Sequence, residues 1–199
     1  LKRFEPGTSL SSTPNPYGLY LATVAGKTLM RHRDGRTLPS PLAAAYTIRS
    51  SEGLIVAPSR VQRGDTPIDL FGAVDVSGKW IVPAEFRGLE PFESGLAIAQ
   101  ADGGDTPAYG LVDKQGRYVV EPNYSQLTRA SHGWYTGKRA NGSVDVFSTS
   151  GERLIAFDCS DGGEAIENNL SEASEWSVLK GCGQTWVIAD GRRAFRANI

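Results

Sequence analysis

Apolar and polar positions along the chain follow a pattern that recurs about every 38 residues. The two clearest copies are residues 71–83 (FGAVDVSGKWIVP) and 109–122 (YGLVDKQGRYVVEP). In both copies a polar residue and a glycine precede a charged residue and then a β-branched or aromatic run. Glycine reaches positive φ without a steric penalty, so this order predicts a tight hairpin that leads into a strand. Self-similarity at a fixed period predicts a fold built by stacking one small unit.

Two sets of glycines keep a constant phase along the chain. Members of the first set end polar turns, and they are Gly35, Gly78, Gly116, Gly151 and Gly191. Members of the second set precede apolar runs, and they are Gly53, Gly95 and Gly133. The distance from a glycine of the first set to the next of the second is 18, 17 and 17 residues. This phase predicts four to five units of about three antiparallel strands each.

We therefore expect an all-β protein of antiparallel β-hairpin repeats, arranged as a propeller-like ring or a curved repeat array. Ring closure is favoured because it removes the sheet edges that an open array exposes. Residues 1–16, which combine serine, threonine and proline, are interpreted as an N-terminal arm or linker. Residues 17–199 are interpreted as a single β-repeat domain. One or two helical turns are allowed at 41–46 and 163–173.

Aromatic residues recur at fixed positions of the repeat. The pairs are Phe71 and Tyr109, Trp80 and Tyr118, and Phe86 and Tyr124. One aromatic residue per unit at one phase is how a stacked core is filled, so these side chains are expected in core layers. Trp134, Trp176 and Trp186 are less regular. These three tryptophans are the candidates for a recognition surface.

The span from Phe71 to Pro122, with the intervening residues 92–97 (FESGLA), resembles the WG (KWG) repeat of many bacterial proteins. Phe71 and Tyr109 stand where that family has its name-giving tryptophan before glycine. The resemblance weakens toward Ala156 and is poor elsewhere. It implies a binding or scaffold module, because members of that family are usually treated as such.

Composition narrows the choice of partner. The 199 residues carry a formal net charge of -1, so there is no basic excess to attract nucleic acid, and no nucleic-acid partner is expected. No apolar run approaches the roughly 20 residues that a membrane helix requires, so no membrane span is expected either. Oligomeric state is left open.

Few residues suggest catalysis, and we expect no catalytic, cofactor-binding or metal site. The chain has two histidines, His32 and His132, and the position of His132 is taken by Glu52 and Ser94 in the neighbouring copies. A dedicated proton-transfer role for His132 is therefore not expected. No Cys-x-x-Cys motif is present, which argues against zinc.

Cys159 and Cys182 are the two cysteines of the chain. They are either two thiols or one disulfide, and their position at a break of the period favours the disulfide, which would limit fraying of the last unit. The break itself, residues 158–173, is expected to be an irregular loop.

The function that we expect is a non-catalytic protein-binding or scaffold module that presents variable loops to a protein or cell-surface partner. One alternative is an immunity or inhibitor protein that blocks a toxin enzyme. The other is a hydrolase or lyase with a site near residues 158–167, where acidic residues interrupt the repeat. The expected location is periplasmic or extracellular, with the cytoplasm as the alternative.

Overall fold

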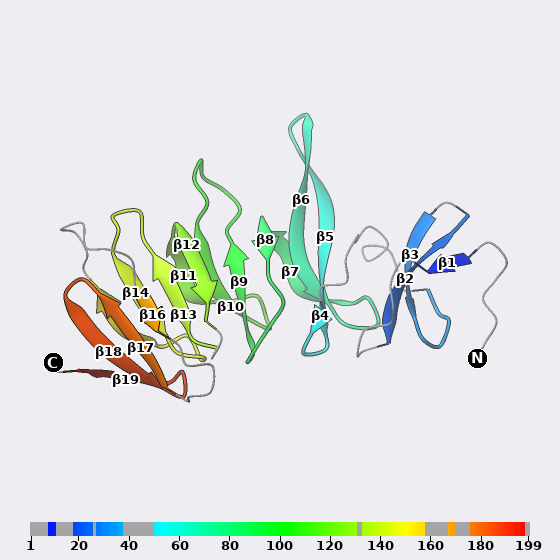
Figure 1. Ribbon diagram of the computed structural model, residues 1–199. Coiled ribbons are helices and arrows are strands. Elements are labelled where there is room, and N and C mark those ends of the chain that lie inside the picture. Colours follow the sequence, from blue (N-terminus) through cyan, green and yellow to red (C-terminus); the bar gives the residue numbers. More distant parts are fainter. Residues whose placement is uncertain are drawn as a thin grey trace. The chain divides into compact units, whose positions relative to one another are not determined.

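The structure, a computed structural model, describes residues 8–10, 18–25, 27–37, 50–130, 133–157, 167–169 and 176–197. These residues form strands and turns, with no helix among them, and every strand pair is antiparallel (Figure 1). The predicted all-β fold of hairpin repeats is therefore confirmed. The possible helical turn at 41–46 lies outside the described residues. Of the segment 158–173, residues 167–169 are described and form a strand, so the expected irregular loop and the possible helical turn at 163–173 are wrong there.

The strands form five sheets that follow one another along the chain. The first sheet has the order β1 (Thr8–Leu10), β2 (Leu19–Val24), β3 (Lys27–His32). The second has the order β4 (Ser50–Ser51), β5 (Leu54–Arg63), β6 (Thr66–Val74), β7 (Trp80–Phe86). The third has the order β8 (Gly88–Leu89), β9 (Leu96–Gln100), β10 (Tyr109–Asp113), β11 (Tyr118–Tyr124). The fourth has the order β12 (Gln126–Arg129), β13 (Tyr135–Lys138), β14 (Val144–Phe147), β15 (Arg153–Phe157). The fifth has the order β16 (Glu167–Asn169), β17 (Trp176–Gly181), β18 (Gln184–Ala189), β19 (Arg193–Arg196).

A complete repeat thus has four strands, one more than the sequence suggests. The additional strand is the first of each sheet, and it is as short as two residues in β4 and β8. So short a segment carries no alternation of apolar and polar residues, which explains why the pattern does not reveal it.

The chain forms two compact units, residues 1–92 with 114–116 and residues 93–113 with 117–199. The first unit has an apolar cluster that includes Leu19, Met30 and Ile55. The second has two clusters, one around Leu111 and Tyr135 and one around Trp134, Phe157 and Leu179.

The turn between the third and fourth strands, which we call the closing turn, has one geometry in four sheets. These closing turns are His32–Arg36, Asp75–Lys79, Asp113–Arg117 and Ser148–Glu152. In each, the amide of the first residue donates to the carbonyl of the fifth, over 2.8 to 3.1 Å. The fourth residue is a glycine at positive φ, between 81° and 92°. The predicted hairpins at Gly35, Gly78, Gly116 and Gly151 are therefore confirmed.

The first side chain of the closing turn caps its amides. Asp75 Oδ1 accepts from the amides of Ser77 and Lys79 at 2.7 and 3.1 Å. Asp113 Oδ1 accepts from the Arg117 amide at 3.0 Å. Hydrogen bonds from the Ser77 hydroxyl and from these amides hold the pKa of Asp75 below its ordinary value.

The turn between the first and second strands, which we call the entry turn, has two residues in the second and third sheets. Its central residues, Glu52-Gly53 and Ser94-Gly95, all have positive φ, between 51° and 83°, as a type I′ turn requires. Gly133 differs from the other two glycines of its set, because it ends a five-residue turn in which the Ala130 amide donates to the Trp134 carbonyl at 2.8 Å.

Gly72 and Gly110 allow the fourth strand to bulge. Tyr109 pairs with Tyr124 and Leu111 with Val120, so one residue of β10, Gly110, faces three residues of β11. A Cβ atom at Gly110 would collide with the Val120 carbonyl oxygen and lie 3.0 Å from the nitrogen of Pro122. Proline is tolerated in such a bulge because its missing amide is not needed for pairing. This contact explains why glycine and proline recur together in the repeat.

The predicted core positions are confirmed for Phe86 and Tyr124, whereas the other four aromatic residues of the layers, Phe71, Trp80, Tyr109 and Tyr118, are half-buried. β7 and β11 share one sequence of buried and exposed positions, in which Trp80 and Tyr118 are half-buried. Phe86 and Tyr124, which follow six residues later, are each 4% exposed.

Replacement of Gly110 by alanine should destabilise the protein by about 3 kcal/mol, because the new methyl group meets backbone atoms of β11 that cannot rotate away. Chemical denaturation measures the loss. Glu121→Ala is the control, since Glu121 is exposed in the same bulge and surface changes cost within about 0.5 kcal/mol. Equal stability of the two variants would contradict the proposed role of the bulge.

Candidate functional site

The connection between the second and third strands, which we call the outer hairpin, differs from sheet to sheet. It comprises residues 64–65, 101–108, 139–143 and 182–183 in the second to fifth sheets. The strands that lead to it also vary, since β5 and β6 have 10 and 9 residues whereas β9 and β10 have 5 each. At the opposite end, the closing turns of the first four sheets share one geometry, whereas the fifth sheet has a shorter turn in which the Arg192 amide donates to the Ala189 carbonyl at 3.0 Å.

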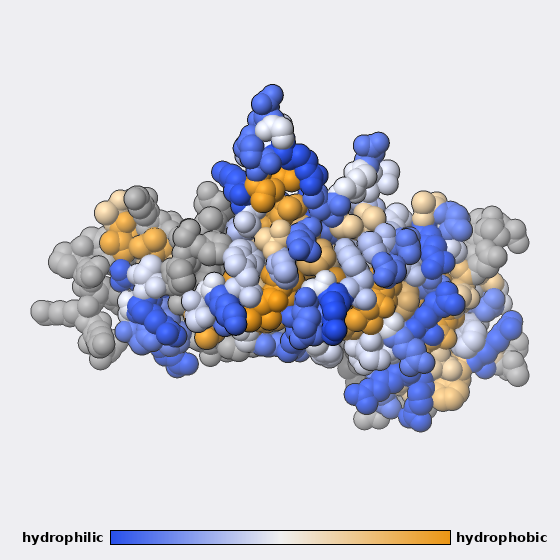
Figure 2. All heavy atoms as spheres, turned by 180° about the vertical axis from the view of Figure 1, so that it is seen from behind, coloured by the Kyte–Doolittle hydropathy of each residue, from blue (hydrophilic) through white to orange (hydrophobic). Residues whose placement is uncertain are grey.

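The outer hairpin of the second sheet lies at the end of the two longest strands, β5 and β6, and projects beyond the other strands of its sheet (Figure 1). This β5–β6 arm, residues 58–70, ends in Arg63-Gly64-Asp65-Thr66, all exposed. Arg60 and Asp69 form an ion pair across it at 2.9 Å, and the half-buried Val61 and Ile68 pair next to them. Because neighbouring pairs point to opposite faces, the arm has one charged and one apolar face. Figure 2 shows two projections with hydrophilic tips.

The segment Gly-Asp-Thr-Pro occurs twice, at residues 64–67 and 104–107, and both copies are exposed. Pro67 lies within β6 and pairs with Gln62. β7 pairs with β6 only from Phe71 onward, so Pro67 occupies a stretch where no second neighbour needs its amide.

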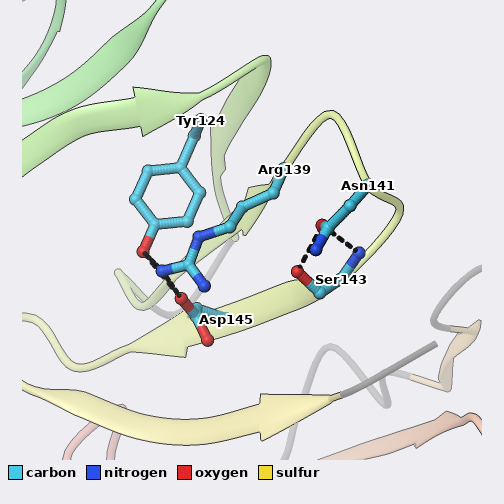
Figure 3. Close-up of polar contacts among 5 residues, drawn as sticks. All are labelled: Tyr124, Arg139, Asn141, Ser143 and Asp145. Carbon is cyan, nitrogen blue, oxygen red and sulfur yellow. Dashed lines mark hydrogen bonds and ion pairs between the residues drawn. The ribbon is translucent and has the colours of Figure 1, made fainter. Parts of the chain in front are cut away.

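The outer hairpin of the fourth sheet is a five-residue turn, Arg139–Ser143, with its own side-chain cap. Asn141 Oδ1 accepts hydrogen bonds from the amide and the hydroxyl of Ser143, at 3.1 and 2.7 Å (Figure 3). The Arg139 amide donates to the Ser143 carbonyl at 2.9 Å. Ala140 and Asn141 are exposed at its tip. The turn is therefore ordered while it presents polar groups to solvent.

A buried polar cluster, Tyr124, Arg139 and Asp145, holds the base of this turn (Figure 3). The Tyr124 hydroxyl donates to Asp145 Oδ2 at 2.7 Å, and the Arg139 guanidinium lies 2.6 Å from the same oxygen. Arg139 also donates to the Tyr124 hydroxyl at 2.9 Å and stacks over its ring, 5.0 Å from the centroid. Asp145 is 2% exposed, so its charge requires these partners.

The cluster results from three departures from the repeat. Asp145 occupies the position of Gly72 and Gly110, and the Tyr124 hydroxyl is added to a position that is Phe86 in the second sheet. Gly137 replaces the alanine found at positions 57 and 99. A Cβ atom at Gly137 would lie 2.5 Å from the Tyr124 ring, so this glycine makes room for it. Sequence reasoning missed the cluster, although the aspartate in a glycine column was its signal.

Burial raises the pKa of Tyr124 to about 12 from an ordinary 10.0, and the hydrogen bond to Asp145 adds to the shift. A phenolate beside the Asp145 carboxylate would bring two negative charges together. Tyr124 therefore remains a neutral donor at physiological pH.

Arg129 makes a second arrangement of this type in the same unit. Its guanidinium pairs with Glu93 at 2.8 Å, donates to the Tyr135 hydroxyl at 2.8 Å, and lies 5.0 Å from the centre of that ring. The Arg129 side chain is 13% exposed, and it also donates to the Leu96 carbonyl at 3.2 Å. These contacts connect β12 to the entry turn that precedes β9.

The three candidate tryptophans have different positions. Trp134 is 1% exposed and donates from Nε1 to the Ser177 hydroxyl at 3.3 Å, so it belongs to the core and the prediction that it forms a recognition surface is corrected. Trp186 is half-buried against the same cluster and donates to Gln184 Oε1 at 3.1 Å. The side chain of Trp176 lies outside the described residues.

The cysteines, the histidines and the acidic segment are the other residues considered in the sequence analysis, and the structure describes only some of them. Cys182 is a disulfide cysteine in the left-handed region, with φ 52°, but Cys159 lies outside the described residues and the bridge between them stays a prediction. His132 and residues 158–166 also lie outside them. His32 Nδ1 lies 2.9 Å from Asp34 in a closing turn.

In the part of the chain that the structure describes, no three His, Cys, Asp or Glu side chains gather in a way that could hold a metal ion. The same part contains no helix with the length and apolar character needed to cross a membrane.

The Tyr124→Phe variant should lose about 1 to 2 kcal/mol of unfolding free energy at neutral pH, because Asp145 loses a buried hydrogen bond. The loss should shrink as pH rises from 10.0 toward about 12. In that window the unfolded chain ionises its tyrosine while the folded protein keeps Tyr124 protonated, so the wild type alone loses this contribution. Urea denaturation at several pH values measures the difference, and a gap independent of pH would contradict the assignment.

Comparison with known proteins gives one family. Residues 71–104 and 109–136 match the model of the WG containing repeat, and these stretches include β7 to β12 with the end of β6 and the start of β13. No curated protein matches the chain. The matched residues include the Gly72 and Gly110 bulges and the aromatic layers described above. Over these two stretches the chain is therefore similar to the WG-repeat family.

Proposed function

We propose that the protein is a non-catalytic binding module that recognises a protein partner through its outer hairpins. The observation that carries this proposal is the contrast between the two ends of the sheets. The closing turns of the first four sheets share one hydrogen-bonded geometry, whereas the outer hairpins of the second to fifth sheets have 2, 8, 5 and 2 residues and different sequences. A fixed scaffold with variable connections at one end is typical of binding proteins.

The Arg139–Ser143 turn supports this role because it is preorganised. Its tip is exposed, while Arg139 at its base is fixed by Asp145 and Tyr124. A turn that is already ordered loses little conformational entropy when it binds, which favours affinity. The β5–β6 arm, in the first compact unit, is a separate exposed surface with the ion pair of Arg60 and Asp69 on one face.

The partner class that we favour is a protein or a cell-surface component in the periplasm or outside the cell. Disulfides persist in oxidising compartments, and Cys182 is disulfide-bonded. An immunity or inhibitor protein is the second candidate, because ordered polar turns and a projecting arm also suit the blocking of an enzyme's active site.

Shortening of the β5–β6 arm tests the proposal. Deletion of residues 60–63 together with 66–69 removes four paired positions and keeps the Gly64-Asp65 turn and the Ser59–Leu70 pair. We expect the dissociation constant for a partner captured from the source organism, then purified, to rise at least about tenfold. Titration calorimetry measures it, and an enzyme assay on the partner distinguishes the inhibitor from the scaffold.

A matched control changes the opposite end of the same sheet. Val76→Ser alters an exposed residue of the closing turn, 38% accessible, and should leave the dissociation constant unchanged. Binding that survives the arm deletion and a second variant at the turn tip, Asn141→Ala, would refute recognition through the outer hairpins.

A further inference from the structure

Three turns of the second compact unit line an open pocket of about 570 Å³, whose described lining residues are polar or charged. Ser94 comes from an entry turn, Thr149 and Ser150 from the closing turn of the fourth sheet, and Asp190 and Arg192 from that of the fifth. Entry and closing turns lie at the same end of an antiparallel four-stranded sheet, so the pocket is remote from the outer hairpins. Its volume is within the range of small-molecule sites.

The sides of the pocket are held together by contacts between the turns. The Thr149 amide donates to the Gly191 carbonyl at 3.0 Å, which joins the two closing turns. The Thr149 methyl group packs beside Gly133, because a Cβ atom placed on that glycine would lie 3.2 Å from it. These contacts fix the turn that supplies two of the hydroxyl groups.

The closing turn of the fourth sheet, which lines the pocket, lacks the negative charge that the second and third sheets have at its first residue. Ser148 occupies the capping position of Asp75 and Asp113, and its hydroxyl accepts from the amides of Ser150 and Glu152 at 3.2 and 3.1 Å. The hydroxyl makes the same hydrogen bonds as the carboxylate without its negative charge. Thr149 stands where the third sheet has Lys114.

Arg192 is the charged group that faces this pocket without an ion-pair partner in the described residues. Asp190, by contrast, lies 3.3 Å from Arg193 Nη2. The lining therefore combines an available guanidinium with three hydroxyls and a carboxylate that still accepts hydrogen bonds. Guanidinium binds a carboxylate through two parallel hydrogen bonds, which makes a carboxylate the natural ligand group for Arg192.

We propose that this pocket binds a uronic acid, a sugar whose carboxylate pairs with Arg192. The ring hydroxyls of such a sugar would exchange hydrogen bonds with Ser94, Thr149 and Ser150, and would donate to Asp190. Asp190 repels a doubly charged group such as phosphate more strongly than a singly charged carboxylate. The described residues that line the pocket include no aromatic side chain, so they offer no surface on which a nucleobase would stack.

Titration with glucuronate, followed by amide chemical shifts in NMR spectra, tests the proposal. Saturable shifts are expected at Ser94, Thr149, Ser150 and Arg192. Arg192→Ala should raise the dissociation constant at least about tenfold, the loss typical of a charge-assisted contact. Arg196→Ala is the matched control, because Arg196 is an exposed arginine of β19 that does not line the pocket.

Three further probes separate the possible ligand chemistries. Glucose lacks the carboxylate, glutamate carries carboxylates without ring hydroxyls, and inorganic phosphate carries a different anion. Weaker binding of all three than of glucuronate supports the proposal. Equal or tighter binding of any of them, shifts confined to other amides, or equal effects of the two arginine variants would overturn it. The β5–β6 arm deletion should leave glucuronate binding unchanged, so this result is independent of the proposed protein partner.

Discussion

The hydrogen bonds that close each hairpin at its third strand are the constraint on which the rest of the structure depends. A five-residue turn reverses the chain only because its glycine adopts positive φ and because the first residue satisfies its amides, as Asp75 does for Ser77 and Lys79. With this turn fixed, the register of the third and fourth strands is fixed too. The bulge opposite Gly72 or Gly110 then places Phe86 or Tyr124 in the core.

Much of this could be predicted from the sequence, because turns and aromatic layers are encoded by residue type at a constant spacing. Glycine is favoured at positions 78 and 116 because the closing turn requires positive φ there. The alternation of buried and exposed residues in β7 and β11 is likewise local. The short strands could not be predicted, since β8 has two residues and depends on pairing rather than on a pattern. Trp134 was misassigned because irregular spacing does not reveal whether a side chain is buried.

The Tyr124–Arg139–Asp145 cluster shows how a repeat acquires an individual feature. An aspartate in a position that elsewhere requires glycine would be unfavourable alone, since a buried carboxylate costs several kcal/mol without partners. The added hydroxyl of Tyr124 and the guanidinium of Arg139 supply those partners, and Gly137 supplies the space. Such a feature depends on residues from three different strands, so no single column of the repeat predicts it.

The same separation between fixed and variable parts explains why binding is best sought at the ends of the sheets. Core positions such as Val82 and Val120 are tied to the repeat by packing and tolerate little change. Residues at the turns are free of that constraint where another side chain satisfies the backbone hydrogen bonds. Ser148, for example, accepts from the Glu152 amide in place of an aspartate. Once the cap no longer needs a carboxylate, the charge of the surrounding surface is free to diverge. A turn that keeps its backbone geometry but has exchanged its side chains is thus a second kind of place for recognition, beside the outer hairpins.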